Sequence, residues 1–189
     1  DEDIILAQLL GLKVTEFSKL VEISEINEKN AEKIIKQLVK TKKVILFEPM
    51  EKLNPSSWLS TKNYWANFSK EIIMVIEAYH KKYPLDSGIN IEELSKKLGL
   101  TKKAFARVIE KIIFAREIIS KNGKIMLESH YIEFSSDQKE LVSNLEKVFS
   151  NSPFLTPSAQ ECIEIVGKDV FQALIEIGTI VEVAPGIVF

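Results

Sequence analysis

The sequence predicts a mainly α-helical protein with small β-hairpins, built as three repeats of one small unit. A helix, a short helix, a longer helix and a β-rich tail follow one another three times within the 189 residues. Hairpin signals stand at equivalent places, at Asn122-Gly123 and in "TIVEVAPGIVF" at residues 179–189. Three helices followed by a two-stranded wing form a winged helix, so we predict three tandem winged-helix domains. The hairpins argue against the alternative of one domain of unrelated helices.

The first predicted domain covers residues 1–62. We expect helices at 3–11, at 14–23 with Thr15 as the N-cap, and at 27–43, followed by a strand at 44–47. Segment 48–63 is expected to complete the wing, because it contains apolar side chains that need burial. The third helix has apolar residues at helical spacing on one face, namely Ala31, Ile34, Ile35, Leu38 and Val39.

The second predicted domain covers residues 63–134, with helices at 63–83, 90–99 and 100–117. We expect Asn90 and Thr101 to be N-caps, Asn90 in a capping box with Glu93. Between the first two helices stands "PLDSG", residues 84–88, which has the composition of a turn. Pro84 is expected to end the first helix.

Two residues of this connection carry separate expectations. Gly88 is expected to hold a positive φ. His80 is interpreted as a helix-end cation or as part of the turn packing, at little cost to stability if replaced by Ala.

The third predicted domain covers residues 135–189. Helices are expected at 135–149, at 156–166, and at 168–178 with Gly178 as the C-cap. For the middle helix we expect Thr156 as the N-cap and Pro157 at the first helical position, where a missing N–H costs nothing.

Charge differs among the three predicted domains. Residues 1–62 are neutral, residues 63–134 have a net charge of +3, and residues 135–189 have a net charge of −5. The density that a phosphate backbone requires occurs only between Lys96 and Arg116, where seven basic residues stand against Glu110. We therefore name as candidate RNA contacts the cations of this segment and of the following wing: Lys96, Lys97, Lys102, Lys103, Arg107, Lys111, Arg116, Lys121 and Lys124.

Within this set, Lys103, Arg107 and Lys111 are spaced four residues apart and share one face of the predicted third helix. That helix would meet nucleic acid in a helix-turn-helix protein. A solvated basic face is the alternative, and the sequence leaves both open.

Signals for catalysis, metal binding and membrane insertion are missing. There is no nucleophile elbow, Gly-rich phosphate loop or pair of catalytic carboxylates at a recognisable spacing, so we expect no enzymatic activity, no cofactor and no metal. The two histidines, His80 and His130, have no cysteine or further histidine beside them in the sequence. Cys162 is the single cysteine, stands in an apolar helical stripe and is expected in the core. No apolar run approaches the roughly 20 residues of a membrane span, and we expect a cytoplasmic protein.

Several short motifs resemble one family when their order and spacing are taken together. They are Trp65, Tyr79-His80, Pro84-Leu85, Gly88, Glu92-Glu93-Leu94, "LTPSAQE" at residues 155–161 and "VEVAPGIVF" at residues 181–189. In this arrangement the chain resembles the tandem winged-helix extension of the bacterial selenocysteine-specific translation elongation factor, over essentially its whole length. The start at Asp1-Glu2-Asp3, without Met, leads us to expect a fragment of a longer protein.

The resemblance implies a non-catalytic arm in selenocysteine incorporation. In that family a GTPase carries selenocysteyl-tRNA, and the last winged helix binds an mRNA hairpin, the selenocysteine insertion element. By resemblance, this chain corresponds to the first three winged helices and links those two functions, with GTP and Mg belonging to the full-length protein only. The implied partners are the ribosome, the mRNA hairpin and selenocysteyl-tRNA, through the full-length protein, and we expect a monomer. A DNA-binding transcription regulator and a winged-helix protein-interaction module are the alternatives.

Overall fold

The computed structural model of the protein describes residues 1–151 and 156–189. The chain forms two compact units, each made of two segments. The first combines Asp1–Val75 with Ile91–Ile119, and the second combines Ile76–Asn90 with Ser120–Phe189. This boundary passes through the residues predicted as the second winged helix, and the division at residues 62 and 134 stays a prediction. The predicted fold class is confirmed, since the described residues form helices with three small sheets.

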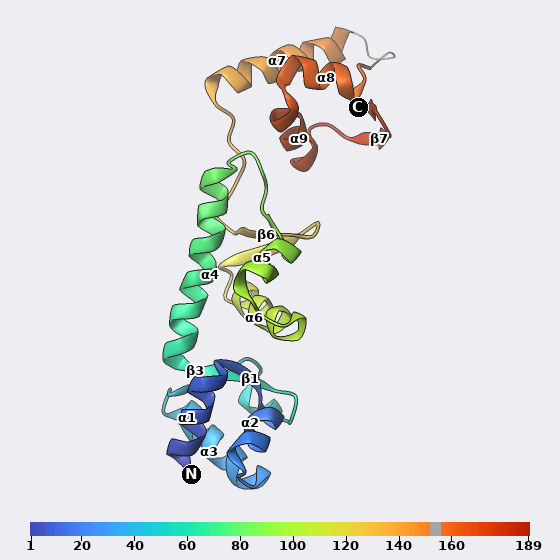
Figure 1. Ribbon diagram of the computed structural model, residues 1–189. Coiled ribbons are helices and arrows are strands. Elements are labelled where there is room, and N and C mark those ends of the chain that lie inside the picture. Colours follow the sequence, from blue (N-terminus) through green and yellow to red (C-terminus); the bar gives the residue numbers. More distant parts are fainter. Residues whose placement is uncertain (152–155) are drawn as a thin grey trace. The chain divides into compact units, whose positions relative to one another are not determined.

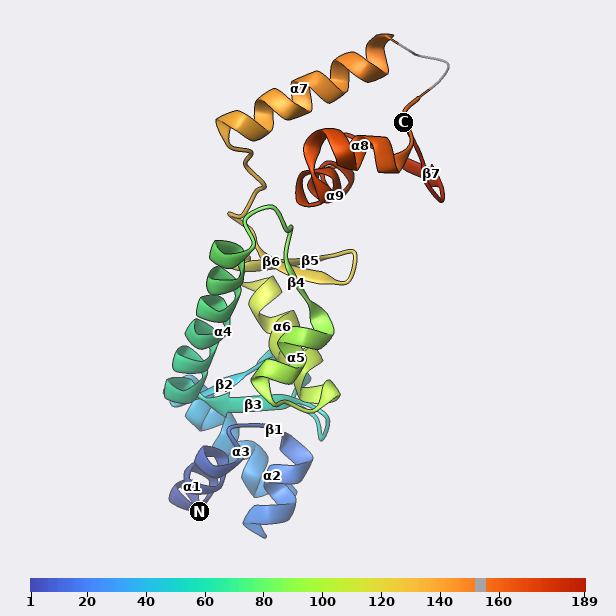
Figure 2. The same ribbon diagram turned by 45° about the horizontal axis from the view of Figure 1, so that its top comes forward.

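The first unit contains a complete winged helix near the N-terminus. Three helices lie on one side of an antiparallel sheet of strand order β1-β3-β2 (Figure 2). The apolar face predicted for the third helix is buried in the core with residues from α1, α2 and the sheet. The elements are α1 (Glu2–Leu12), β1 (Val14–Glu16), α2 (Phe17–Ser24), α3 (Glu28–Lys40), β2 (Val44–Leu46), a 3-10 turn η1 (Met50–Lys52) and β3 (Trp58–Thr61).

The expected N-cap at Thr15 is wrong. Thr15 lies in β1, buried and paired with Leu59 of β3, and Glu16 is the residue that precedes α2. The extended backbone that a β-branched residue favours is used here for sheet pairing rather than for capping.

The next elements confirm most of the local expectations. They are α4 (Lys62–Lys82), β4 (Ile89–Asn90), α5 (Ile91–Leu98), α6 (Lys102–Phe114), β5 (Ile118–Lys121) and β6 (Lys124–Leu127). Thr101 caps α6, because its hydroxyl accepts a hydrogen bond from the N–H of Ala104 at 3.3 Å. Asn122 and Gly123 have φ values of 50° and 74°, as a tight hairpin turn requires. Asn90 lies in β4, directly before α5, where β4 pairs with β6.

The last elements belong to the second unit and form a small domain with its own core (Figure 1). They are α7 (Ser136–Asn151), α8 (Ala159–Val166), α9 (Lys168–Glu176), β7 (Glu182–Ala184) and β8 (Ile187–Val188). Cys162 is fully buried in this core, as predicted. The C-cap of α9 is Ile177 and not Gly178 as expected, and Gly178 is the next residue, with a φ of 80°.

The predicted start of the middle helix is wrong by two residues. Ser158 is the N-cap of α8, and it forms a capping box with Glu161. Thr156 and Pro157 lie outside the helix. The Ser-x-x-Glu pair satisfies two free backbone N–H groups at once, which a Thr156 cap would not do. Leu155 of the "LTPSAQE" motif lies outside the described residues.

Candidate nucleic-acid interface and domain junctions

The predicted cations lie on four elements and do not form one surface of free charges. Lys96 and Lys97 end α5, the four from Lys102 to Lys111 lie on α6, Arg116 follows α6, and Lys121 and Lys124 lie on the wing strands β5 and β6. Three of the nine, Lys103, Lys111 and Lys124, bind groups of neighbouring domains.

Lys111 and Lys103 attach α6 to the sheet of the first winged helix, within the first unit. The ammonium group of Lys111 donates hydrogen bonds to the backbone carbonyls of Leu46 at 3.0 Å and Phe47 at 3.1 Å. Burial lowers the pKa of Lys111, and the nearby Glu48 carboxylate opposes that shift. Lys103 forms an ion pair with Glu16 at the end of β1. Two residues of the predicted RNA-binding face, Lys103 and Lys111, therefore have partners in the first winged helix.

Three of the predicted cations of the first unit that have no partner in a neighbouring domain lie at the turn between α5 and α6, while the exposed Arg107 lies on α6 and the exposed Arg116 follows it. Lys96, Lys97 and Lys102, which we call the turn cluster, are exposed. Lys97 pairs with Glu93 at 3.2 Å on the solvent-exposed surface, and Arg107 on α6 pairs with Glu110 at 2.9 Å. Exposed pairs of this kind contribute little and exchange readily for phosphate.

A second junction, within the second unit, centres on Lys124 of the wing. Its ammonium group donates to Asp86 at 2.8 Å and to Glu176, at the end of α9, at 2.5 Å. Glu176 also accepts a hydrogen bond from the backbone N–H of Ser87 at 3.0 Å. We call Lys124, Asp86 and Glu176 the charge clamp, because it joins α9 to both the turn after α4 and the wing.

The charges of the clamp stabilise one another. Burial alone would raise the pKa of Asp86, but hydrogen bonds from Lys124, the Gly88 N–H and the Tyr79 hydroxyl hold that pKa below its ordinary value. Burial likewise would raise the pKa of Glu176, and hydrogen bonds from Lys124 and Ser87 lower it. Burial lowers the pKa of Lys124, but its two carboxylate partners more than offset this, so all three groups are ionised at neutral pH.

The clamp leads to a prediction about stability. Removing the shared cation by Lys124→Met leaves Asp86 and Glu176 close together without their partner. We expect the free energy of unfolding of the second unit to fall by about 2–4 kcal/mol, because unpaired, half-buried carboxylates are costly. The matched control is Lys121→Met on the same hairpin, which should change it by less than about 0.5 kcal/mol. Urea unfolding of both variants checks this, and equal midpoints would contradict the clamp.

His80 is not a helix-end cation. It is buried, its ring stacks on His130 with centroids 3.5 Å apart, and Nε2 accepts a hydrogen bond from the N–H of Leu127 at 3.3 Å. Burial and the neighbouring His130 lower its pKa to about 4, although Asp86 acts in the opposite direction. The ring is therefore neutral at pH 7, with its proton on Nδ1, and the alternative interpretation as turn packing is confirmed. His130 in turn donates from Nε2 to the carbonyl of Asp86 at 3.1 Å.

The lowered pKa of His80 predicts acid sensitivity. The ordinary value is 6.5 and the folded value about 4, so the unfolded chain binds more protons between these limits. The free energy of unfolding of the second unit should therefore fall as pH decreases from 6.5 toward 4. Urea midpoints measured at pH 7.5 and pH 5.0 check this. In His80→Gln most of the difference should disappear, and an unchanged difference would contradict the assignment.

Gly88 does not have the positive φ that we expected. It is required for a steric reason instead. A Cβ at this position would lie 2.5 Å from the carbonyl oxygen of Ile125, in the strand that pairs with β4. The turn thus needs glycine because β6 passes too close for a side chain.

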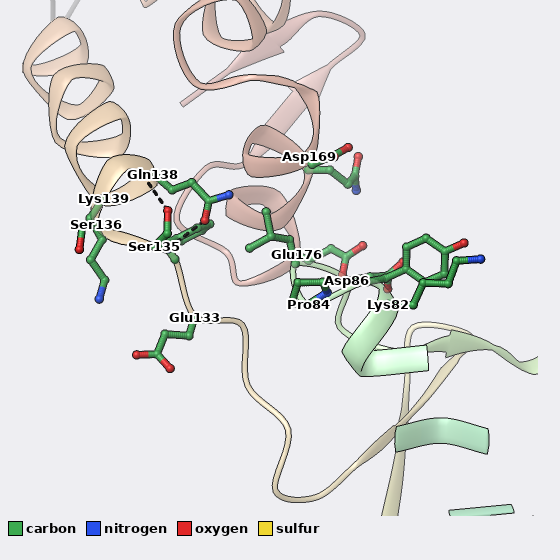
Figure 3. A pocket seen from close by; sticks show the side chains of 14 residues that line it. Lys82, Pro84, Asp86, Glu133, Ser135, Ser136, Gln138, Lys139, Asp169 and Glu176 are labelled. Atoms are coloured by element: carbon green, nitrogen blue, oxygen red, sulfur yellow. Dashed lines mark hydrogen bonds between the residues drawn. The ribbon is translucent and has the colours of Figure 1, made fainter. Parts of the chain in front are cut away.

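A hollow of about 990 Å³ in the second unit lies beside the charge clamp. Figure 3 shows its lining from the turn after α4, from the connector before α7 and from α9. Its lining includes four acids, Asp86, Glu133, Asp169 and Glu176, and two lysines, Lys82 and Lys139. This excess of acids makes it unsuitable for phosphate.

Sequence reasoning missed Asp86, Glu176 and the stacking of His80 on His130. The opposite net charges of residues 63–134 and 135–189 signalled an attraction between these segments. These net charges did not identify which side chains form the ion pairs. Within the described residues, no group of three or more His, Cys, Asp or Glu side chains is placed to hold a metal ion. None of the helices that the structure describes is long and apolar enough to cross a membrane.

Comparison with known proteins supports the resemblance noted in the sequence. The family model "Elongation factor SelB, winged helix" matches residues 73–127. None of the curated proteins compared with this chain matches it. Among solved structures, the chain is similar to the mRNA-binding domain of elongation factor SelB from E. coli in complex with SECIS RNA, with a TM-score of 0.49 and 9% identity, over 67% of this chain and 95% of that one. The winged-helix domain in residues 73–127 belongs to the elongation factor SelB family.

Proposed function

We propose that this chain is the non-catalytic winged-helix arm of a selenocysteine-specific elongation factor. It links the GTPase part, which holds selenocysteyl-tRNA, to the end that binds the mRNA hairpin on the ribosome. The observation that carries this proposal is the match of residues 73–127 to a SelB winged helix. The uneven charge agrees with it, because residues 135–189 have a net charge of −5 and would repel RNA, as befits a spacer.

The two junctions support a role in holding neighbouring domains. At the first, Lys111 of α6 binds the carbonyls at the end of β2. At the second, Glu176 at the end of α9 binds Lys124 of a wing strand. In both cases the third helix of one predicted domain contacts the sheet of the domain before it. A third helix occupied in this way is not free to enter a major groove, which disfavours the transcription-regulator alternative.

RNA contact in the first unit is assigned to the turn cluster. Lys96, Lys97 and Lys102 are exposed, and no neighbouring domain holds them within the described residues. Such a cluster would contact phosphates of ribosomal RNA without reading sequence.

Selenocysteine insertion tests the proposed function directly. The test protein is a chimera in which this chain replaces the corresponding winged helices of a SelB elongation factor. It would be expressed in cells that lack their own SelB, and decoding of a UGA codon would be measured with a reporter. We expect decoding with the chimera, and at least a several-fold loss when the clamp is broken by Lys124→Met. Lys139→Met, at an exposed lysine of α7, is the control. A chimera that is folded and present at normal levels but does not decode UGA would contradict the proposal.

A further inference from the structure

A second hollow in the second unit lies between the wing β5–β6, the connector that follows it and the end of α9. We call it the wing groove, and it has a volume of about 440 Å³. This volume is within the range of small-ligand sites. Apolar atoms make up most of its surface, although more than half of its lining residues are polar or charged. The residues used below are Lys121, Asn122, Met126, Tyr131 and Ile177.

Tyr131 offers a free aromatic surface at this groove. Its side chain is 74% exposed, and no other ring of the described residues stacks on it. Ile177 is 49% exposed on the α9 side, whereas Met126 is buried. A large exposed aromatic beside an apolar hollow is a platform for a flat ring, and nucleobases stack on such platforms.

The charge around the groove suits a phosphate next to that ring. Lys121 is exposed on the wing, and no carboxylate of the described residues pairs with it. The acid that lines the groove, Glu176, is paired with Lys124, which lines it as well. With Lys121, the charged residues of the lining sum to +1, and Asp86 is not among them. The accessible cation is therefore Lys121, and Asn122 at the hairpin turn adds an amide able to donate and accept hydrogen bonds.

We propose that the wing groove binds one nucleotide of single-stranded RNA, with the base stacked on Tyr131 and a phosphate at Lys121. This inference rests on the proposed role of the chain in RNA-dependent translation and adds a contact separate from the turn cluster. The hollow takes one base, so double-stranded RNA, whose bases are stacked inside the helix, is excluded.

Binding of a fluorescent octauridylate to the full chain tests the inference. Tyr131→Ala should weaken binding by roughly 5- to 150-fold, as the loss of one base stack does, and Tyr131→Phe should bind nearly as the wild type. Lys121→Gln should reduce the slope of log affinity against log salt by about 0.7, the value for one phosphate contact on a single strand. The matched control is Lys139→Gln on α7, which should leave both quantities unchanged.

Two further measurements are needed. One separates RNA from free nucleotide as the ligand, and the other separates the groove inference from the proposed arm function. Free UMP should bind far more weakly than octauridylate, and equal affinity would overturn the RNA assignment. Equal octauridylate affinity for the wild type and Tyr131→Ala would also overturn it. In the UGA-decoding chimera, Tyr131→Ala tests the groove alone. This variant could decode UGA normally although the isolated chain no longer binds octauridylate. The proposed arm function would then stand, and the wing groove would have no part in that function.

Discussion

Gly88→Ala is expected to lower the free energy of unfolding of the second unit by about 1–3 kcal/mol, the usual cost of overpacking. The added Cβ would lie 2.5 Å from the carbonyl oxygen of Ile125 and 2.9 Å from its carbonyl carbon. These are backbone atoms of a paired strand, so they cannot rotate away as the end of a flexible side chain would. The β4–β6 pairing between Ile89 and Ile125 would have to shift. Thermal and urea unfolding measure the effect.

Gly11→Ala is the matched control for this change. Gly11 lies in α1 without a positive φ, and a Cβ there would meet no atom within 4 Å. Alanine should therefore stabilise that helix by about 0.5–1 kcal/mol, the ordinary difference between the two residues in a helix. If the two variants lost stability equally, close approach of β6 would not be the reason for Gly88.

His80→Ala is expected to cost about 2–4 kcal/mol, much more than the sequence suggested. The change removes a buried ring that stacks on His130 at 3.5 Å, and it leaves the N–H of Leu127 without its acceptor. Loss of packing and an unsatisfied buried donor both contribute. Urea unfolding at pH 7.5 is the measurement, because the ring is neutral there.

Lys81→Ala, one residue further along the same helix, is the control for His80→Ala. Lys81 is exposed, and its replacement should change the free energy of unfolding by less than about 0.5 kcal/mol. His80→Gln should recover part of the loss, since a side-chain amide oxygen can accept the hydrogen bond of Leu127. An effect of His80→Ala as small as that of Lys81→Ala would show that the ring is not structural.

Local patterns predicted the elements well. Apolar spacing located α3, because Ala31, Ile35 and Leu38 repeat at the helical period and are buried as expected. Asn122-Gly123 located the wing turn, because few other residues accept two positive φ angles in succession. Thr15 was misassigned because a Thr before a helix suits both a cap and a strand, and only pairing with β3 decides between them.

The functional groups depended on tertiary contacts and were harder to predict. Asp86, Lys124 and Glu176 are far apart in the sequence, so no spacing signals the clamp. As predicted, one helical face carries Lys103, Arg107 and Lys111. Two of these residues, Lys103 and Lys111, bind groups of the sheet of the first winged helix. Helical spacing shows which side chains lie together on a helix and does not show whether solvent, RNA or another domain covers them.

Lysines of the third helix α6 hold domains together, while RNA contact is assigned to the turn cluster. The most direct test compares two variants of equal net charge, Lys96→Gln/Lys102→Gln and Lys103→Gln/Lys111→Gln. Affinity for a ribosomal RNA helix would be measured for each across a series of salt concentrations. We expect the first pair to flatten the slope of log affinity against log salt by about 1.4–1.8, the value for two phosphate contacts, and the second pair to leave it unchanged. A slope flattened only by the Lys103/Lys111 pair would show that α6, and not the turn cluster, contacts RNA.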